Sequence, residues 1–188
     1  MSRVRIQQRT RIYVGCEGES EQSYVARLSQ IVDAACLHLH FDNDLLRPGG
    51  GDPLALVELA IRRIQEKEAK RGAFVFRAIL QDRDKVGIKP ERDAQIVPMA
   101  RQNWLHLIWQ EPCHEGFLLR HLEGRQAARP ATSDLAAHAL KSVWPEYQKA
   151  MPALQLASRI DLQAVRRAAS VERAFADFID QIGLIPRS

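Results

Sequence analysis

The chain has 188 residues, of which 46% are hydrophobic and 27% are charged, and its formal net charge is +4. This size suits one well-buried core rather than two, and no run of about 18 apolar residues is present, so we expect one domain and no membrane span. Three cysteines without a CxxC pair argue against a disulfide framework and a zinc knuckle, and the basic N-terminus lacks an apolar signal core, which together predict a cytoplasmic protein.

The first part of the chain alternates between strand and helix patterns. Residues 11–14 are short and β-prone, and apolar residues at helical spacing follow from about Ser20. A second strand is predicted at residues 37–41. The glycine-rich loop 47–53 then leads into a further helix, for which Asp52 is a suitable N-cap.

The strongest strand pattern lies in the middle of the chain, at residues 73–81 (AFVFRAILQ), a nearly continuous apolar run of the kind that a parallel sheet buries on both faces. A helix is predicted at 91–101 and a fourth strand at 104–110, whose Trp104 and Trp109 are expected to pack against the sheet. Alternating strands and helices predict an α/β fold with a four-stranded, mainly parallel sheet flanked by helices and joined by right-handed crossovers.

From Glu115 onward the pattern is helical. Three helices are expected there, at residues 117–122, 135–144 and 162–182. The segment 123–134 (EGRQAARPATSD) is predicted to be a mobile loop. The sheet core would therefore span about residues 10–122 and a C-terminal helical extension about 132–188, within a single domain covering residues 1–188.

Acidic side chains follow three of the predicted strands. They are Glu17 after the first strand, Asp82 and Asp84 after the third, and Glu115 after the fourth. Ligands of an open parallel sheet bind outside the carboxyl ends of its strands. Residues two apart in extended backbone also project to the same side, so Asp82 and Asp84 should point together. We expect these carboxylates to meet at one edge of the sheet.

Carboxylates at such close range repel one another, and a divalent cation relieves the conflict. Mg²⁺ or Mn²⁺ takes hard oxygen ligands and needs neither histidine nor cysteine. A metal held this way activates water and neutralises charge on a phosphodiester, which predicts metal-dependent phosphodiester cleavage. The alternative for each motif taken alone is simpler: a glutamate-rich turn that favours the dipole of the next helix, and a polar turn after a strand.

Three short segments resemble the sequence blocks of the RloB-like proteins, whose toprim-like domain is similar to that of primases, topoisomerases and OLD-family nucleases. The segments are CEGESEQSY (16–24), ILQDRDK (79–85) and EPCHEGFLLRHL (111–122), in the family's order and spacing. The resemblance implies a toprim-like fold and Mg²⁺ chemistry. It also implies a nuclease of DNA or RNA, with tRNA among the candidate substrates, that acts in bacterial phage defence or abortive infection, often beside an ATPase partner. The resemblance does not decide whether the protein forms an oligomer.

The resemblance also implies roles for individual residues. Glu17, Asp82 and Asp84 correspond to the metal-binding acids, Glu115 to an added acid of the family, and Glu21 to the second glutamate of the first block. The first block is one residue shorter than usual and lacks a lysine, which removes a plausible phosphate contact. The third block has Glu111, His114 and Phe117 where the family usually has Asn, Phe and Trp.

Other candidates lie beside these acids. His114, next to Glu115, is a candidate general acid or base, because imidazole exchanges protons near neutral pH. Arg83 and Lys85, beside the acidic pair, are candidates for contact with substrate phosphate, although a surface lysine is the simpler interpretation of Lys85. Zinc held by histidines would need a third ligand that the sequence does not provide.

Two other functions remain open from the sequence. One is a noncatalytic regulatory subunit of a defence complex, in which the helix at 162–182 docks a partner such as an ATPase. The other is phosphoryl or nucleotidyl transfer of the primase kind, for which no separate acidic motif or zinc-binding segment is visible.

Overall fold

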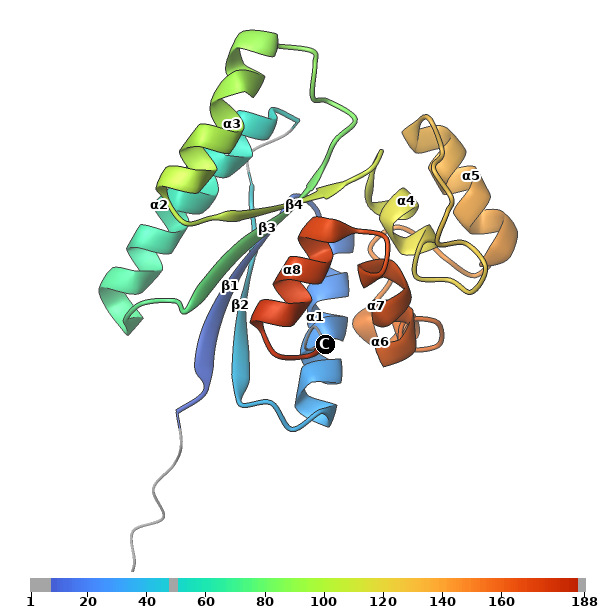
Figure 1. The fold of residues 1–188 in the computed structure, drawn as a ribbon, viewed down its shortest axis with the longest axis horizontal. Helices are drawn as coiled ribbons and strands as arrows, with labels where there is room; N and C mark the ends of the chain where they lie inside the picture. The colour runs from blue at the N-terminus through green and yellow to red at the C-terminus, as the bar shows by residue number, and fades with distance from the viewer. Residues whose placement is uncertain (1–7, 48–50, 186–188) are drawn as a thin grey trace, which may run out of the picture.

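A computed structural model describes residues 8–47 and 51–185 as a sheet of parallel strands between helical layers (Figure 1). The arrangement confirms the predicted α/β class and agrees with a toprim-like fold. Three residues of the glycine-rich loop 47–53 lie outside the described residues, as does most of the N-terminal stretch 1–10 on which the expectation of an unexported protein rests. Within the described part of the chain, every helix is too short or too polar to cross a bilayer.

The sheet has four strands in the order β2-β1-β3-β4, all parallel. They are β1 Thr10–Cys16, β2 Leu39–Leu45, β3 Phe76–Asp82 and β4 His106–Gln110. The chain passes from β1 to β2 on one side and then crosses to β3 on the other side of β1. The strand order therefore reverses between β1 and β3, and the carboxyl ends of these two strands form the topological switch point where α/β sheets bind ligands.

Helices cover both faces of the sheet. On one face lie α1 (Glu19–Ala34) and α8 (Arg173–Gln181), and on the other lie α2 (Pro53–Arg71) and α3 (Pro90–Gln102) (Figure 1). Alternate residues of β1 serve the two layers, as the period of a strand requires. Val14 packs in the core under α1 and α8, whereas Tyr13 packs in the core under α2 and α3.

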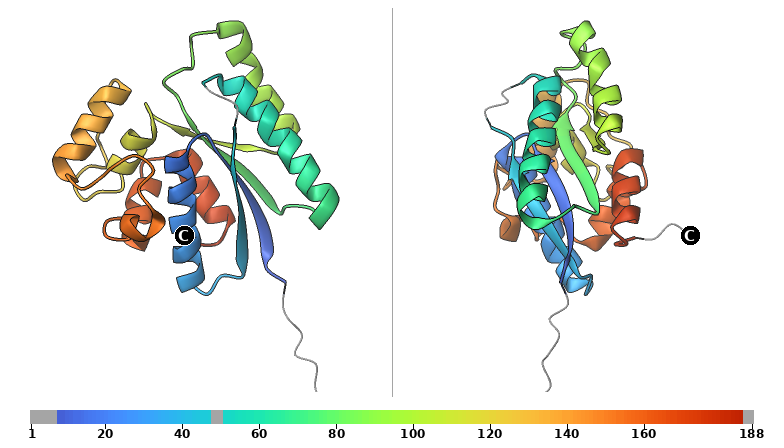
Figure 2. Two further views of the ribbon diagram at one scale, coloured as in Figure 1. Left: turned by 180° about the vertical axis from the view of Figure 1, so that it is seen from behind. Right: turned by 90° about the vertical axis from the view of Figure 1, so that its left-hand side faces the viewer.

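The remaining helices gather to one side, beside α1 and away from α2 and α3 (Figures 1 and 2). They are α4 His114–Leu119, α5 Ser133–Val143, α6 Ala153–Leu156 and α7 Leu162–Ala169. Trp144, Tyr147 and Ile160 from this part belong to the same hydrophobic core as Val14 and α1. The C-terminal helices thus share a core with one face of the sheet.

The predicted long helix at 162–182 is wrong, because the structure has two helices there, α7 and α8, separated by residues 170–172. The Ser170 hydroxyl donates to the Arg167 carbonyl at 2.7 Å, and the Glu172 carboxylate forms an ion pair with the guanidinium of Arg120. The break turns α8 so that Phe175 and Phe178 are buried in the core of the sheet. This apolar face is not available for docking a partner.

The fourth strand is shorter than expected, and Trp104 does not pack against the sheet. Trp104 lies in the turn before β4 with φ of 53° and is 83% exposed, so that expectation is wrong. The positive φ lets the chain reverse out of α3. Trp109, within β4, is partly buried against the core under α2 and α3, as predicted.

Candidate functional site

Glu17 and Asp82 meet at the switch point of the sheet. Glu17 directly follows β1, and Asp82 is the last residue of β3. In the register of these paired strands Cys16 lies opposite Leu80, so the two acids leave the sheet within one residue of the same level. Glu17 Oε2 accepts a hydrogen bond of 2.9 Å from the backbone N–H of Asp82. The prediction that these two segments deliver their acids to one place is confirmed.

Glu21 joins them from the first turn of α1. Its Oε2 accepts the backbone N–H of the N-cap residue Gly18 at 3.0 Å, which is half of a capping box and satisfies an amide that the helix itself leaves unpaired. The other oxygen, Oε1, lies 3.6 Å from His114 Nδ1. Glu21 is only 4% exposed, so it both caps the helix and contributes a buried carboxylate to the site.

Gln110 ties these groups together and was not found by sequence reasoning. It ends β4 directly opposite Asp82 and is fully buried. In the amide orientation that satisfies both ends of its side chain, the nitrogen donates to Asp82 Oδ1 (3.1 Å) and Glu21 Oε1 (3.0 Å), and the oxygen accepts from His114 Nδ1 (2.8 Å). The sequence does contain a feature that could have pointed to Gln110: it is a polar residue at the end of a strand that is otherwise apolar and buried.

Glu115 reaches the site from α4. Its Oε1 accepts a hydrogen bond from the Tyr147 hydroxyl at 3.3 Å, and its Oε2 accepts one from Cys113 Sγ at 3.3 Å. The next residue, Gly116, lies so close to the β4–α4 turn that an added Cβ would be 2.6 Å from the Glu111 carbonyl oxygen. Glycine at this position therefore lets α4 start close enough to the sheet to bring Glu115 to the pocket.

Five acidic residues, Glu17, Glu19, Glu21, Asp82 and Glu115, line one cavity of about 270 Å³. Its walls also carry two cationic side chains, Arg47 and Lys149, that sequence reasoning did not identify. They come from the segment after β2 and from the segment between α5 and α6, and no motif marks either of them. Arg47 forms an exposed ion pair of 3.1 Å with Glu19. Lys149 makes no hydrogen bond or ion pair with any residue that the structure describes.

The electrostatics of this pocket suppress ionisation of Asp82 and Glu17. Burial raises the pKa of Asp82 to about 9, and the charges of Glu21, Glu17, Asp84 and Glu115 add to the effect in that order. Burial also raises the pKa of Glu17, although the Asp82 amide and Lys85 oppose the shift. The site concentrates negative charge without enough neighbouring cations to balance it.

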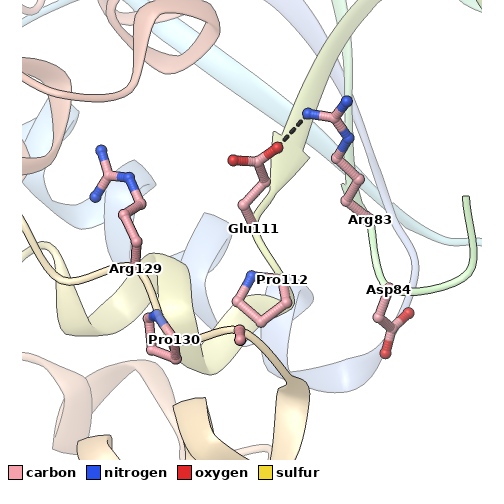
Figure 3. A pocket seen from close by; sticks show the side chains of 7 residues that line it. Arg83, Asp84, Glu111, Pro112, Arg129 and Pro130 are labelled. Atoms are coloured by element: carbon pink, nitrogen blue, oxygen red, sulfur yellow. Dashed lines mark hydrogen bonds and ion pairs between the residues drawn. The ribbon is translucent and has the colours of Figure 1, made fainter.

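Asp84 takes a different direction from Asp82. The strand ends at Asp82, because the Arg83 N–H turns to the carbonyls of Gln110 and Pro112 (3.1 Å each), and Asp84 lies in the turn that follows. The extended backbone assumed from the sequence stops before Asp84. Its Oδ2 accepts the hydroxyl of Ser133 at 2.8 Å, and its side chain lines a neighbouring cavity rather than the acid pocket (Figure 3).

The remaining candidates are spread around the acid pocket. Lys85 lines a small cavity of about 30 Å³ beside the N-terminus of α2. Arg83 forms an ion pair with Glu111 in the cavity of Figure 3.

The two histidines of the third sequence block are both buried. His114 lines the acid pocket but is only 3% exposed. His121 bonds Tyr24 at 2.8 Å, and burial lowers its pKa to about 3, which makes it a structural histidine.

The donor chemistry of the pocket fits a hard divalent cation. Glu17, Glu21, Asp82 and Glu115 offer only carboxylate oxygens, which Mg²⁺ and Mn²⁺ prefer. A cation would also remove the repulsion that raises the pKa of Asp82. Within residues 8–47 and 51–185, no three His, Cys, Asp or Glu side chains are already arranged as a ligand set. Glu17 and Glu21 are each engaged with a backbone amide instead.

Comparison with known proteins gives one match. A family model described as RloB-like protein matches residues 12–181, which is most of the chain and includes every acid of the pocket. No curated protein and no solved structure matches the chain.

Proposed function

The chain belongs to the RloB-like protein family, and on that premise we propose that it is a nuclease that uses Mg²⁺ or Mn²⁺ to cleave phosphodiester bonds in DNA or RNA, in bacterial defence against phage. The observation that carries the proposal is the gathering of Glu17, Glu21, Asp82 and Glu115 in one pocket at the switch point of the sheet.

Purely structural roles do not account for this pocket. Burying carboxylates beside one another costs stability, and here the cost is large enough to raise the pKa of Asp82 to about 9. Strongly perturbed pKa values in a cleft are typical of functional sites. A protein that needed only a stable strand end at this position would do better with an uncharged residue.

We assign the metal to Glu17 and Asp82. Asp84, which bonds Ser133 and lines the neighbouring cavity, would join them only after its side chain turns toward the acid pocket. When bound, the cation would polarise the phosphodiester and lower the pKa of a water molecule. Gln110 fixes the Asp82 carboxylate by donating to Oδ1, and Tyr147 fixes Glu115 in the same way. These positioning contacts keep the acids in place before substrate arrives, so that little reorganisation is needed during the reaction.

Proton transfer and substrate binding fall to other residues of the pocket. His114 is oriented by its hydrogen bond to Gln110 and is placed to exchange a proton with the Glu21 carboxylate, which lines the cavity. Lys149 and Arg47 are the cationic side chains that face the acids and are assigned to the substrate phosphate. Lys149 thereby offers, from a distant segment, the kind of contact that the shortened first block lacks.

The test is cleavage of mixed DNA and tRNA by the purified chain in Mg²⁺, Mn²⁺ or EDTA. We expect Glu17→Gln and Asp82→Asn each to reduce cleavage by at least about 100-fold, because the loss of a metal ligand removes several kcal/mol of transition-state stabilisation. Glu58→Gln is the matched control, since Glu58 is exposed on α2, outside the pocket. Calorimetry with Mn²⁺ should show binding to the control and none to Asp82→Asn.

The assay should be run with and without an ATPase encoded beside the gene, because a partner can be needed for activity. Cleavage that survives in Asp82→Asn at the level of the control would disprove the assignment. Phage protection that survives the same substitution in cells would instead favour the noncatalytic subunit.

A further inference from the structure

A second cavity, of about 280 Å³, lies on the other side of the turn that follows β3 (Figure 3). It is lined by Arg83, Asp84, Glu111, Pro112, Arg129, Pro130 and Ala131. Asp82 lines the acid pocket and Asp84 lines this cavity, so the two sites share one short turn as a wall. We propose that this second cavity binds the substrate phosphate next to the one that is cut, with Arg83 as its ligand and Glu111 as the resting partner of Arg83. The inference rests on the proposed nuclease function.

Arg83 has the chemistry of a phosphate ligand. Its side chain is about half exposed, and its guanidinium has Glu111 as its partner through Nη1 (Figure 3). The other guanidinium N–H groups make no hydrogen bond with the residues that the structure describes, which leaves a fork of donors facing solvent. Exposed ion pairs contribute little free energy, whereas a guanidinium binds phosphate through paired, charge-assisted hydrogen bonds. A phosphate can therefore displace the Glu111 carboxylate.

Arg129 supplies a fixed positive charge on the opposite wall. Its Nη1 donates to the carbonyls of Gln126 and Ala128 at 2.9 Å each, and its Nη2 lies 3.6 Å from Glu172 Oε1. Glu172 is itself paired with Arg120, which is fully buried. Arg129 is thus held in place by several contacts and attracts an anion without further ordering, while Arg83 remains free to turn toward it.

The position of the cavity suits the phosphate one nucleotide away from the cut. Asp84 lies two positions after Asp82, and a step of two residues spans at most about 7 Å. A nucleic-acid strand that crosses this turn would place one phosphate at the acid pocket and the next beside Arg83. Pro112, Pro130 and Ala131 give the cavity an apolar surface against which the intervening sugar can pack.

The test measures binding of a fluorescent single-stranded oligonucleotide and of its duplex by anisotropy, with Asp82→Asn as the uncleaving parent protein. We expect Arg83→Gln to weaken binding about 10-fold, because a charge-assisted contact is lost. Glu111→Gln should tighten binding about 2- to 3-fold, because it releases Arg83 from an exposed ion pair. Arg62→Gln, an exposed arginine of α2 on the far side of the sheet, is the matched control and should change nothing.

The double variant Arg83→Gln with Glu111→Gln decides between the proposed competition and a general effect of charge. If Glu111 acts by holding Arg83, the double variant binds like Arg83→Gln alone. A gain from Glu111→Gln that persists without Arg83 would overturn the proposal, as would an Arg83→Gln variant that binds like Arg62→Gln. Thermal unfolding of each variant checks that the fold is intact. Failure of the parent protein to bind nucleic acid at all, together with an inactive wild type, would instead refute the proposed function.

Discussion

Two groups of carboxylates flank β1, and their surroundings differ. On β2, Asp42 pairs with Arg11 at 3.0 Å and with Lys67 at 2.5 Å, and Lys67 also lies 3.5 Å from Asp44. At the carboxyl end of the sheet, the largest charge effects on Glu17 and Asp82 come from other acids. Acids of the same type on neighbouring strands are therefore balanced by cations in one place and crowded together in the other.

The pKa values show the consequence of this difference. Burial acts to raise the pKa of Asp42, but hydrogen bonds and charge from Lys67 and Arg11 outweigh it, and the pKa is lowered. Burial and neighbouring acids both raise the pKa of Asp82, to about 9. The β2 group stabilises the fold at neutral pH, whereas the acid pocket weakens it. A charge arrangement that costs stability is the one for which a functional explanation is needed.

The largest effect on stability is expected from breaking the balanced group. Asp42→Ala would leave the partly buried Arg11 without a carboxylate partner and Lys67 with Asp44 alone, so we expect a loss of about 1–3 kcal/mol in the free energy of unfolding. Urea denaturation at pH 7 measures it. Asp33→Ala is the comparison, since its pair with Arg9 is exposed and should contribute less than about 1 kcal/mol. Equal losses in the two variants would show that the ion pairs of Asp42 stabilise the fold no more than an exposed pair does.

The acid pocket should respond to pH in the opposite sense from an ordinary ion pair. Unfolded Asp82 ionises near its usual pKa of 3.8, but the folded protein keeps this proton until about pH 9. The folded state thus binds more protons between these values, and stability in EDTA should fall as pH rises from about 4 to 9. Asp82→Asn should remove this slope and raise the melting temperature at pH 8 by roughly 2–4 °C, equivalent to about 1 kcal/mol.

Calorimetric melting curves at pH 4.5 and 8.5 would test this. If Asp82→Asn melts below the wild type at pH 8.5, Asp82 is ionised and stabilised in the fold, and the neighbouring acids do not disfavour its charged form as proposed. Added Mn²⁺ should stabilise the wild type more at the higher pH, because metal binding must displace the proton.

The smallest effect is expected from Tyr147. Tyr147→Phe removes the hydroxyl that donates to Glu115 Oε1 at 3.3 Å while keeping the ring in the core. We expect a change of about 0.5–1.5 kcal/mol in unfolding free energy. Because Glu115 loses one of its two fixed contacts, cleavage should slow more than stability alone explains, with kcat reduced and KM unchanged. Unaltered kcat would show that Tyr147 has only a packing role.

Much of the fold could be predicted from the sequence, because the local patterns agree with the overall topology. The apolar runs at β1 and β3, the Asp52 cap of α2 and the alternation of elements all predict a parallel sheet, which the structure confirms. Predictions failed where a tertiary contact overrides the local pattern. The helix predicted at 162–182 is interrupted at residues 170–172, where Glu172 pairs with Arg120, and the turn after β3 separates Asp84 from Asp82.

The sequence by itself determined that acids follow the strands of a parallel sheet, since residue order fixes which side chains leave a strand at its carboxyl end. Only the tertiary structure decided which of these acids share a pocket, and that Gln110, Tyr147 and Lys149 accompany them. The physical reason is the distance along the chain between the residues that interact. Strand and helix patterns follow from neighbours in the chain, whereas burial and the fields of distant charges, which set the chemistry of the site, exist only once remote segments are packed together.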